Sequence, residues 1–422
     1  MTTPAARRAF VYVEDLPQKG RSGANLRFWS NLHAFRDLGF EVELVDFAPG
    51  TTDPGFPGVR WTHVEAPGAS PGLLSRVFYR AGFAARSACD YYFSRAPAVR
   101  REVMARARDF PDSVHVLEGE TISSSLIGLK RIRSIWSCHE VPSQCAAGVN
   151  RAIRDLQGRS LSRPEIRQER FARSLERRIA ARCGLVFCIS LDDAVRMQTE
   201  WNCSHAESLP TSVADSPTAT PERQWLREGT LRLLHLGGLN HLPSFRSLEF
   251  LLGEVFPRVP GAVLNRIRLT VAGVCDMGSP RSRKILGLIQ RYPQVSFVGY
   301  VEDLKTAYRD ADLQVVVSTD ACGLRTRIIE SFAFGLPVLA TTVASSGIDG
   351  LEADVNVIVA DDAQRIADVL GALLAAPERL ALLAAKGRET YETRHGRGAV
   401  AARLAELLSR HFGIQAPPSL RC

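Results

Sequence analysis

Two arginines and a glutamate stand close together between residues 320 and 341, which read D-A-C-G-L-R-T-R-I-I-E-S-F-A-F-G-L-P-V-L-A-T. Arg325 and Arg327 fall where a turn passes into an amphipathic helix, and Glu330 follows about one turn later. A helix N-terminus carries partial positive charge, so two arginines there are unfavourable unless an anion offsets them. A diphosphate suits this position because backbone N–H groups and guanidinium forks both bind phosphate oxygens. We therefore expect a diphosphate beside Arg325 and Arg327.

Two further groups complete the predicted site. Backbone N–H groups near Gly323 would bind the phosphate, and the carboxylate of Glu330 would accept hydrogen bonds from the hydroxyls of a ribose. The alternative is a solvated helix face, in which Arg327 and Glu330 form an i, i+3 ion pair worth only about 0.2–0.5 kcal/mol. The residues of the helix alone leave both interpretations open.

Apolar runs on both sides of this helix predict buried strands. Residues 313–317 end in three consecutive valines, which is typical of a strand buried on both faces of a parallel sheet. Gly335 and Pro337 end the helix, and a second short strand reaches Ala340. Ligands of a doubly wound sheet bind at the carboxyl ends of its strands, and the helix with the two arginines begins at such an end.

The same residues resemble the donor-binding segment of the retaining glycosyltransferases of family 4, the glycosyl transferase group 1 type. Many members of that family carry G-x-R-x-K-x-x-E, then an apolar helix and G-x-P. Gly323, Arg325 and Glu330 match this pattern, and Arg327 stands where the lysine is usual. Cys322 stands where many members carry an additional glutamate. The resemblance implies an α/β protein of the GT-B fold, with two Rossmann-like doubly wound domains and a cleft between them.

The start of the chain also alternates strand and helix. An apolar strand, an amphipathic helix and a second strand are predicted within residues 9–47, which is a βαβ opening. The loop at residues 19–25 has no G-x-G-x-x-G fingerprint. It resembles the family's loop over the cleft, which implies that Ser22 and Gly23 face the acceptor; a plain turn is the alternative. Residues 51–72 are rich in Pro and Gly and predict an irregular segment.

His139 follows a predicted strand at residues 133–138. In the family a polar or histidine-bearing turn at this place faces the acceptor side of the cleft. The resemblance therefore implies a catalytic or acceptor-positioning role for His139. A polar residue that merely ends a strand is the alternative.

The second half of the chain alternates strand and helix more regularly. Gly237 ends a predicted strand at residues 231–236, where the lack of a side chain lets backbone approach phosphate, although a packing turn is equally compatible. Gly347 belongs to a turn whose N–H groups would also reach the donor. We expect an acceptor-side domain at 1–210, a linker at 211–229, a donor-binding domain at 230–395 and a helix at 396–422. The resemblance to GT-B proteins implies that this last helix packs back on the first domain.

Length and composition limit the classes of function. The 422 residues suit two domains, and 45% hydrophobic with 23% charged residues is typical of a soluble globular protein. The sequence shows neither a run of about 18 apolar residues nor a signal peptide. Its nine cysteines form no C-x-x-C pair or zinc-spaced cluster, so we expect a reduced, cytoplasmic protein.

The net charge of +8 concentrates in one segment. Residues 150–182 hold ten arginines against four acidic residues. A solvated helix face is one interpretation, and a patch for an anionic acceptor or for the inner membrane face is the other. Few aromatic residues lie between the arginines, which argues against nucleic acid as a partner.

The residues and the resemblance together predict a hexosyltransferase of polysaccharide-type biosynthesis that uses a nucleotide-diphosphate sugar. The resemblance to family 4 implies that the reaction retains the anomeric configuration. The acceptor is a glycan, a lipid-linked glycan or a small molecule. No metal or other cofactor is expected, since the arginines offset the diphosphate charge. Two alternatives remain: a non-catalytic GT-B scaffold, and a nicotinamide dehydrogenase, which the missing G-x-G-x-x-G disfavours. The predicted residues are catalytic Arg325, Arg327 and His139; donor-binding Gly237, Gly323, Arg325, Arg327, Glu330 and Gly347; and acceptor-side Ser22 and Gly23.

Overall fold

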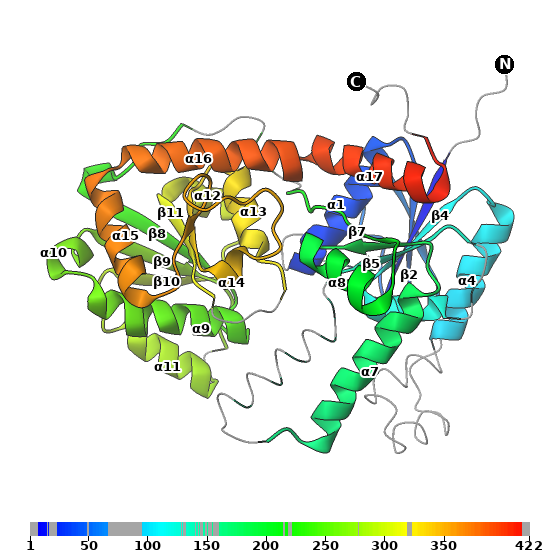
Figure 1. The fold of residues 1–422 in the computed structure, drawn as a ribbon, viewed down its shortest axis with the longest axis horizontal. Coiled ribbons are helices and arrows are strands. Elements are labelled where there is room, and N and C mark those ends of the chain that lie inside the picture. Colours follow the sequence, from blue (N-terminus) through cyan, green and yellow to red (C-terminus); the bar gives the residue numbers. More distant parts are fainter. Residues whose placement is uncertain are drawn as a thin grey trace. The chain divides into compact units, whose positions relative to one another are not determined.

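The chain folds into two compact units, each built on one parallel sheet (Figure 1). Unit 1 comprises Met1–Ala214 and Arg397–Cys422, and unit 2 comprises Asp215–Gly396. The computed structural model describes residues 7–14, 16, 23–48, 50–65, 95–127, 129, 132–139, 141, 143, 147, 150, 154, 160–213, 216–217, 222–276, 278–318 and 323–415.

The sheet of unit 1 has seven strands in the order β3-β2-β1-β4-β5-β6-β7, and all neighbouring pairs are parallel. Its central strands are apolar on both faces, as a sheet covered by helices on both sides requires. The strands are β1 Arg8–Val13, β2 Glu41–Asp46, β3 Val59–His63, β4 Val114–Glu118, β5 Ser134–Cys138, β6 Leu185–Cys188 and β7 Ala206–Ser208.

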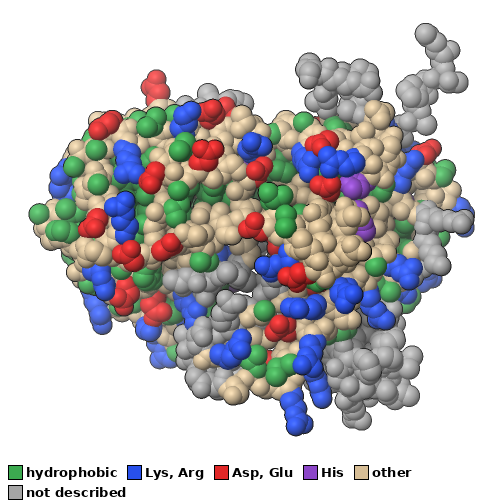
Figure 2. Space-filling model, in the orientation of Figure 1, with side chains coloured by type: hydrophobic (Ala, Val, Ile, Leu, Met, Phe, Trp, Pro, Cys, Tyr) green, Lys and Arg blue, Asp and Glu red, His purple; other side chains and the backbone are tan. Residues whose placement is uncertain are grey.

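Helices cover both faces of this sheet. One hydrophobic core joins alternate residues of β1 to α1 and α17, and a second core joins the intervening residues to α4, α8 and the end of α7. Lys and Arg side chains gather over α7 (Figure 2). The helices are α1 Gly23–Asp37, α4 Ala96–Asp109, α5 Glu120–Ser123, the 3₁₀ turn η1 Ser124–Leu126, α7 Arg163–Ala180, α8 Leu191–Trp201 and α17 Arg397–Phe412.

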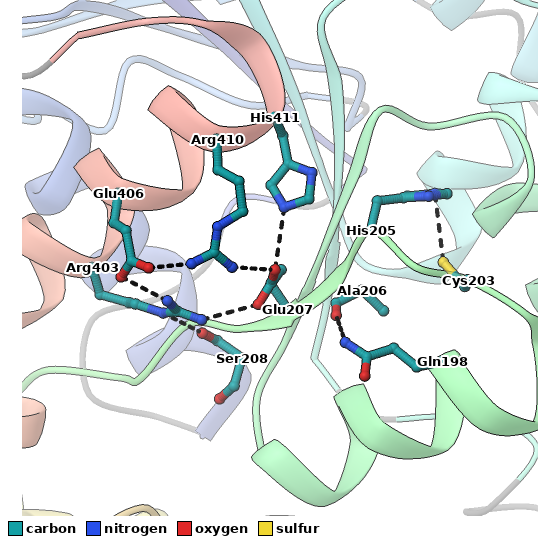
Figure 3. A network of polar contacts seen from close by, with 10 residues as sticks. All are labelled: Gln198, Cys203, His205, Ala206, Glu207, Ser208, Arg403, Glu406, Arg410 and His411. Carbon is teal, nitrogen blue, oxygen red and sulfur yellow. Dashed lines mark hydrogen bonds and ion pairs between the residues drawn. The ribbon is translucent and has the colours of Figure 1, made fainter.

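The last helix, α17, is fixed to unit 1 by polar contacts as well as by its core residues. Glu207 of β7 accepts hydrogen bonds from Arg403 at 3.0 Å and from Arg410 at 2.8 Å, and His411 Nε2 lies 3.2 Å from it (Figure 3). Arg397 pairs bidentately with Asp37 of α1. The final helix therefore packs on the unit that contains the start of the chain.

The sheet of unit 2 has six parallel strands in the order β10-β9-β8-β11-β12-β13. They are β8 Leu231–Leu236, β9 Ile267–Ala272, β10 Val295–Gly299, β11 Leu313–Val316, β12 Val338–Ala340 and β13 Ile358–Val359. The helices are α9 Leu242–Phe250, which continues as a π-helical turn Leu251–Val255, α10 Gly261–Leu264, α11 Pro280–Ile289, α12 Leu304–Asp310, α13 Thr326–Ala333, α14 Thr342–Ser345, α15 Ala363–Ala375 and α16 Glu378–Thr390 with the π-helical turn Tyr391–His395.

One sequence-based expectation is wrong. Residues 51–72 were expected to be irregular, but Val59–His63 forms β3, which pairs with β2 along its whole length. The strand is only five residues long and half-exposed, so its apolar alternation is weak, and the flanking Pro and Gly residues obscure it. Its position at the edge of the sheet explains why so little burial is needed.

Candidate active site

The carboxyl ends of four neighbouring strands of unit 2 meet at one edge of its sheet. Gly273 follows β9, Gly237 follows β8, Ser318 comes two residues after β11, and Thr341 follows β12. Since all these strands are parallel, the four residues lie along the same edge. This is the edge at which open α/β sheets bind ligands.

Gly237 brings the end of β8 into close contact with α13. Its φ is 152°, and its N–H donates to the carbonyl of Ala272 at 2.9 Å. A Cβ atom at this position would lie 2.5 Å from Ser244 Oγ and 2.7 Å from Arg327 Nη2. Only glycine therefore fits here, and its absent side chain leaves the space that the Arg327 guanidinium uses. The structure thus brings together two predicted donor-binding residues that lie far apart in the sequence.

Arg327 is a half-buried cation with few partners. Its Nη2 lies 3.4 Å from Ser244 Oγ. Burial lowers its pKa, and the nearby Glu330 and Tyr308 offset only part of that effect. Burial together with the charge of Arg327 also lowers the pKa of His235 to about 3, so this histidine is neutral near pH 7. A partly desolvated arginine of this kind favours an anion beside it.

Glu330 is held by a buried tyrosine. The hydroxyl of Tyr308 donates to Glu330 Oε2 at 3.0 Å, and the Tyr308 ring stacks on Phe334 with centroids 4.9 Å apart. Burial raises the pKa of Glu330, and the bond from Tyr308, the charge of Arg327 and the hydroxyl of Thr326 offset only part of the rise. Among the described residues, no ion pair joins Arg327 to Glu330, although each charge favours ionisation of the other group; both side chains are partly buried.

The remaining donor-side predictions lie on neighbouring loops. Arg325 occupies the N-cap position of α13 without a side-chain capping bond. Its Nη2 donates to Ser318 Oγ at 2.8 Å, and its Nη1 lies 3.4 Å from the carbonyl of Gly323. Gly323 and Gly347 both adopt positive φ, at 66° and 77°. Thr341 caps α14, which precedes Gly347, and donates to the carbonyl of Ser318 at 2.6 Å. Ser318 therefore links the Arg325 side chain to the loop after β12.

His139 of unit 1 belongs to a separate buried network at the carboxyl ends of β4 and β5. Its Nε2 lies 2.6 Å from Glu118 Oε2, and Asn31 of α1 donates to Glu118 Oε1 and to Ser137 Oγ, each at 2.9 Å. Burial opposes ionisation of Glu118, but the bond and charge of His139, with the bonds from Asn31 and Ser137, lower its pKa. His139 is thus fixed by an ionised carboxylate.

Gly23 is the first residue of α1, the helix that supplies Asn31 to this network. Ser22 and Cys322 lie outside the described residues. Sequence reasoning missed the groups that position the predicted side chains, namely Asn31, Glu118, Ser244, Tyr308 and Ser318. Only Glu118 carried a usable signal, because it is a carboxylate at the end of an apolar strand.

The second unit matches a known family. Residues 230–376 match the family model described as Glycosyl transferases group 1. These residues are thus similar to the glycosyltransferases that this model describes. The match covers β8 to α15 and contains every donor-side residue discussed above. The predicted resemblance to the group 1 type is therefore confirmed for this part of the chain.

Solved glycosyltransferase structures match the chain over almost its whole length. Alr3699/HepE of Anabaena in complex with UDP and glucose is 15% identical with a TM-score of 0.66, and the match covers 95% of this chain and 99% of that one. Sucrose-phosphate synthase of Thermosynechococcus elongatus is 18% identical with a TM-score of 0.65, covering 97% and 99%. S. aureus TarM, in complex with UDP, fondaparinux and α-GlcNAc-glycerol, is 10% identical with a TM-score of 0.66, covering 95% and 99%.

These likenesses confirm the predicted fold class, which is GT-B with two Rossmann-like α/β domains. No curated protein sequence matches this chain. Within the described ranges, none of the helices combines the length and the apolar character needed to cross a membrane.

Proposed function

We propose that this protein transfers a sugar from a nucleotide-diphosphate sugar to an acceptor hydroxyl, with retention of the anomeric configuration, as a member of glycosyltransferase family 4. The observation that carries the proposal is the contact between Gly237 and Arg327 at the carboxyl edge of the unit 2 sheet, with Glu330 held beside it. A group 1 domain at residues 230–376 and the fold of UDP-bound glycosyltransferases support it.

The donor diphosphate would lie against Arg325 and Arg327. Arg327 is only half-exposed, so its charge acts on the phosphate with less screening than that of a surface arginine. As the sugar leaves, negative charge grows on the diphosphate, and both guanidinium groups stabilise it as a leaving group. Glu330 would accept hydrogen bonds from the ribose hydroxyls. The N–H groups near Gly323 and Gly347 would complete the phosphate site.

In this proposal no metal ion or other cofactor takes part, because the two arginines supply the positive charge. A donor phosphate oxygen can act as the base in such a reaction, which leaves few catalytic side chains. His139, oriented by Glu118 at 2.6 Å, would position the acceptor hydroxyl together with the loop at Ser22 and Gly23.

The acceptor would be a glycan, a lipid-linked glycan or a small molecule. We place the protein in the cytoplasm, where nucleotide sugars are made. Contact with an anionic membrane face is part of the proposal for a lipid-linked acceptor, and the arginines of residues 160–182 support it.

Donor turnover tests this function without knowledge of the acceptor. The purified chain is incubated with UDP-, GDP- and ADP-sugars, and release of nucleoside diphosphate is measured with and without a panel of glycans. The proposal predicts release from at least one donor, with the freed or transferred sugar first appearing as the anomer of the donor by NMR. Binding of a nucleoside diphosphate without turnover of any donor would instead favour a non-catalytic scaffold.

A further inference from the structure

A basic groove runs along the second half of α7 in unit 1, the helix over which Lys and Arg side chains gather in Figure 2. Its volume is about 600 Å³, and no residue of the group 1 domain takes part in it. The groove, which we call the α7 groove, is lined by Ile127, Arg170, Arg173, Ser174, Arg177, Arg178, Ala181 and Arg182. Five of its eight lining residues are arginines, so its field is strongly positive.

The helical repeat explains how these side chains come together. The lining residues from Arg170 to Ala181 follow one another at i, i+3, i+4, i+7, i+8 and i+11, which places them on one face of α7. The 3₁₀ turn η1 packs against the helix, and Ile127, which directly follows this turn, lines the other wall. The groove is therefore a consequence of the arginine spacing rather than of chance surface charge.

The acidic residues of α7 do not neutralise this face. Glu165 accepts from Ser162 in the capping box at the start of the helix, and Asn150 donates to Glu169 at 3.1 Å. Glu176 is turned inward, where it accepts from the backbone N–H of Ser143 at 2.5 Å. Burial raises the pKa of Glu176 to about 7, so its negative charge is incomplete at neutral pH.

Helix stability accounts for only part of the arginine cluster. Arg177 and Arg178 lie in the last turn, where positive charge interacts favourably with the helix dipole. Arg170 and Arg173 lie further back and gain little from the dipole. Within the described part of the chain, no hydrogen bond or ion pair joins the five guanidinium groups of the groove to another residue. Their donors remain available to a ligand.

The chemistry of the lining indicates what the ligand is. A helix that inserts into a bilayer needs a broad apolar face, whereas Ile127 and Ala181 are the only apolar side chains among the described residues that line the groove. Guanidinium groups bind phosphate oxygens in bidentate pairs, and several arginines in one groove favour more than one phosphate. We propose that the α7 groove is a binding site for phosphate groups, carried either by a soluble diphosphate compound or by the head groups of anionic phospholipids.

Two double variants with the same change in charge test this site. Arg173→Ala with Arg177→Ala removes two arginines that line the groove. Arg163→Ala with Arg167→Ala removes two arginines of the same helix that do not line it. Both are made in a full-length chain that also carries Arg325→Ala and Arg327→Ala, so that the proposed donor site does not bind the probe. Inorganic pyrophosphate is titrated by calorimetry, and binding to phosphatidylglycerol vesicles is measured by flotation.

If the site lies in the groove, the Arg173/Arg177 variant should lose at least about tenfold in affinity for the probe that binds there. The affinity of the Arg163/Arg167 variant for the same probe should change by less than about threefold. If pyrophosphate shows this difference, the ligand is a soluble phosphate compound; if only vesicles show it, the ligand is a lipid head group. Equal losses in the two variants would mean diffuse charge attraction and would overturn the proposal. Absence of binding to both probes would overturn it as well.

Discussion

Tyr308 shows how a single buried hydroxyl sets the chemistry of a carboxylate. It is fully buried, and its hydroxyl bonds to Glu330 Oε2 at 3.0 Å while its ring stacks on Phe334. That bond favours the ionised carboxylate and partly offsets the effect of burial, which raises the pKa of Glu330. An ionised carboxylate accepts stronger hydrogen bonds from the ribose hydroxyls than a protonated one, which has less acceptor capacity.

We predict that the substitution Tyr308→Phe, which removes this hydroxyl, changes the pH dependence of nucleotide binding. Burial raises the pKa of Glu330. As the pH drops through this raised pKa, Glu330 becomes protonated, and we expect the affinity for UDP to fall. In Tyr308→Phe the pKa rises further, so the fall begins at a higher pH. The nearby Arg327 keeps its charge, and His235, with a pKa of about 3, stays neutral between about pH 5 and pH 8. UDP dissociation constants measured across that range check this.

Tyr292→Phe is the matched control, since its hydroxyl donates to the carbonyl of Leu252 at 2.9 Å and not to a site residue. It should leave the pH profile of UDP binding unchanged. Superimposable profiles for the two tyrosine variants would show that Tyr308 has no part in positioning Glu330. If the wild-type chain bound no nucleoside diphosphate at any pH, the donor site itself would be wrong.

At the scale of elements, the contact between β8 and α13 depends on one glycine. A methyl group at Gly237 would overlap Ser244 Oγ and the Arg327 guanidinium, so the side chains of Ser244 and Arg327 must both move. We expect Gly237→Ala to weaken UDP binding at least about tenfold and to lower the free energy of unfolding by roughly 1–3 kcal/mol. Calorimetry and urea unfolding measure the two effects.

Gly287→Ala is the control for this substitution. Gly287 lies within α11 with nothing within 4 Å of a Cβ atom, so alanine there should leave UDP binding unchanged and stabilise the chain by about 0.4–1 kcal/mol. Wild-type UDP affinity in a folded Gly237→Ala protein would show that the close approach at β8 does not shape the donor site.

The sequence predicts the elements of this fold better than the contacts between them. The buried strands and the helix with the two arginines are visible because their apolar spacing is regular. The half-exposed β3 was missed because its signal is weak, and the contact of Gly237 with Arg327 could not be predicted because no periodicity relates residues 90 positions apart. The same holds for Tyr308, whose role depends on how α12 packs beside α13.

At the scale of the whole molecule, the two units have the same kind of sheet but carry different polar residues at its carboxyl edge. Unit 2 carries Arg325, Arg327, Gly237 and the tyrosine-bonded Glu330 along the carboxyl edge of its sheet. Unit 1 carries the Glu118 and His139 pair at the carboxyl edge of its own sheet, together with the α7 groove. In the proposed function, unit 2 holds the donor and unit 1 positions the acceptor. If the units divide the work in this way, substitutions at the carboxyl edge of the unit 2 sheet should weaken binding of the donor.

The most direct test of the account is a titration of UDP against two double variants of the full chain. Arg325→Ala with Arg327→Ala removes both arginines of the proposed diphosphate site. Arg266→Ala with Arg268→Ala removes the same charge near the amino end of β9, at the opposite edge of the same sheet. With folding confirmed by circular dichroism, the account predicts a loss in UDP affinity of at least about tenfold for the first pair and less than about threefold for the second. Wild-type affinity in the Arg325/Arg327 variant would contradict it.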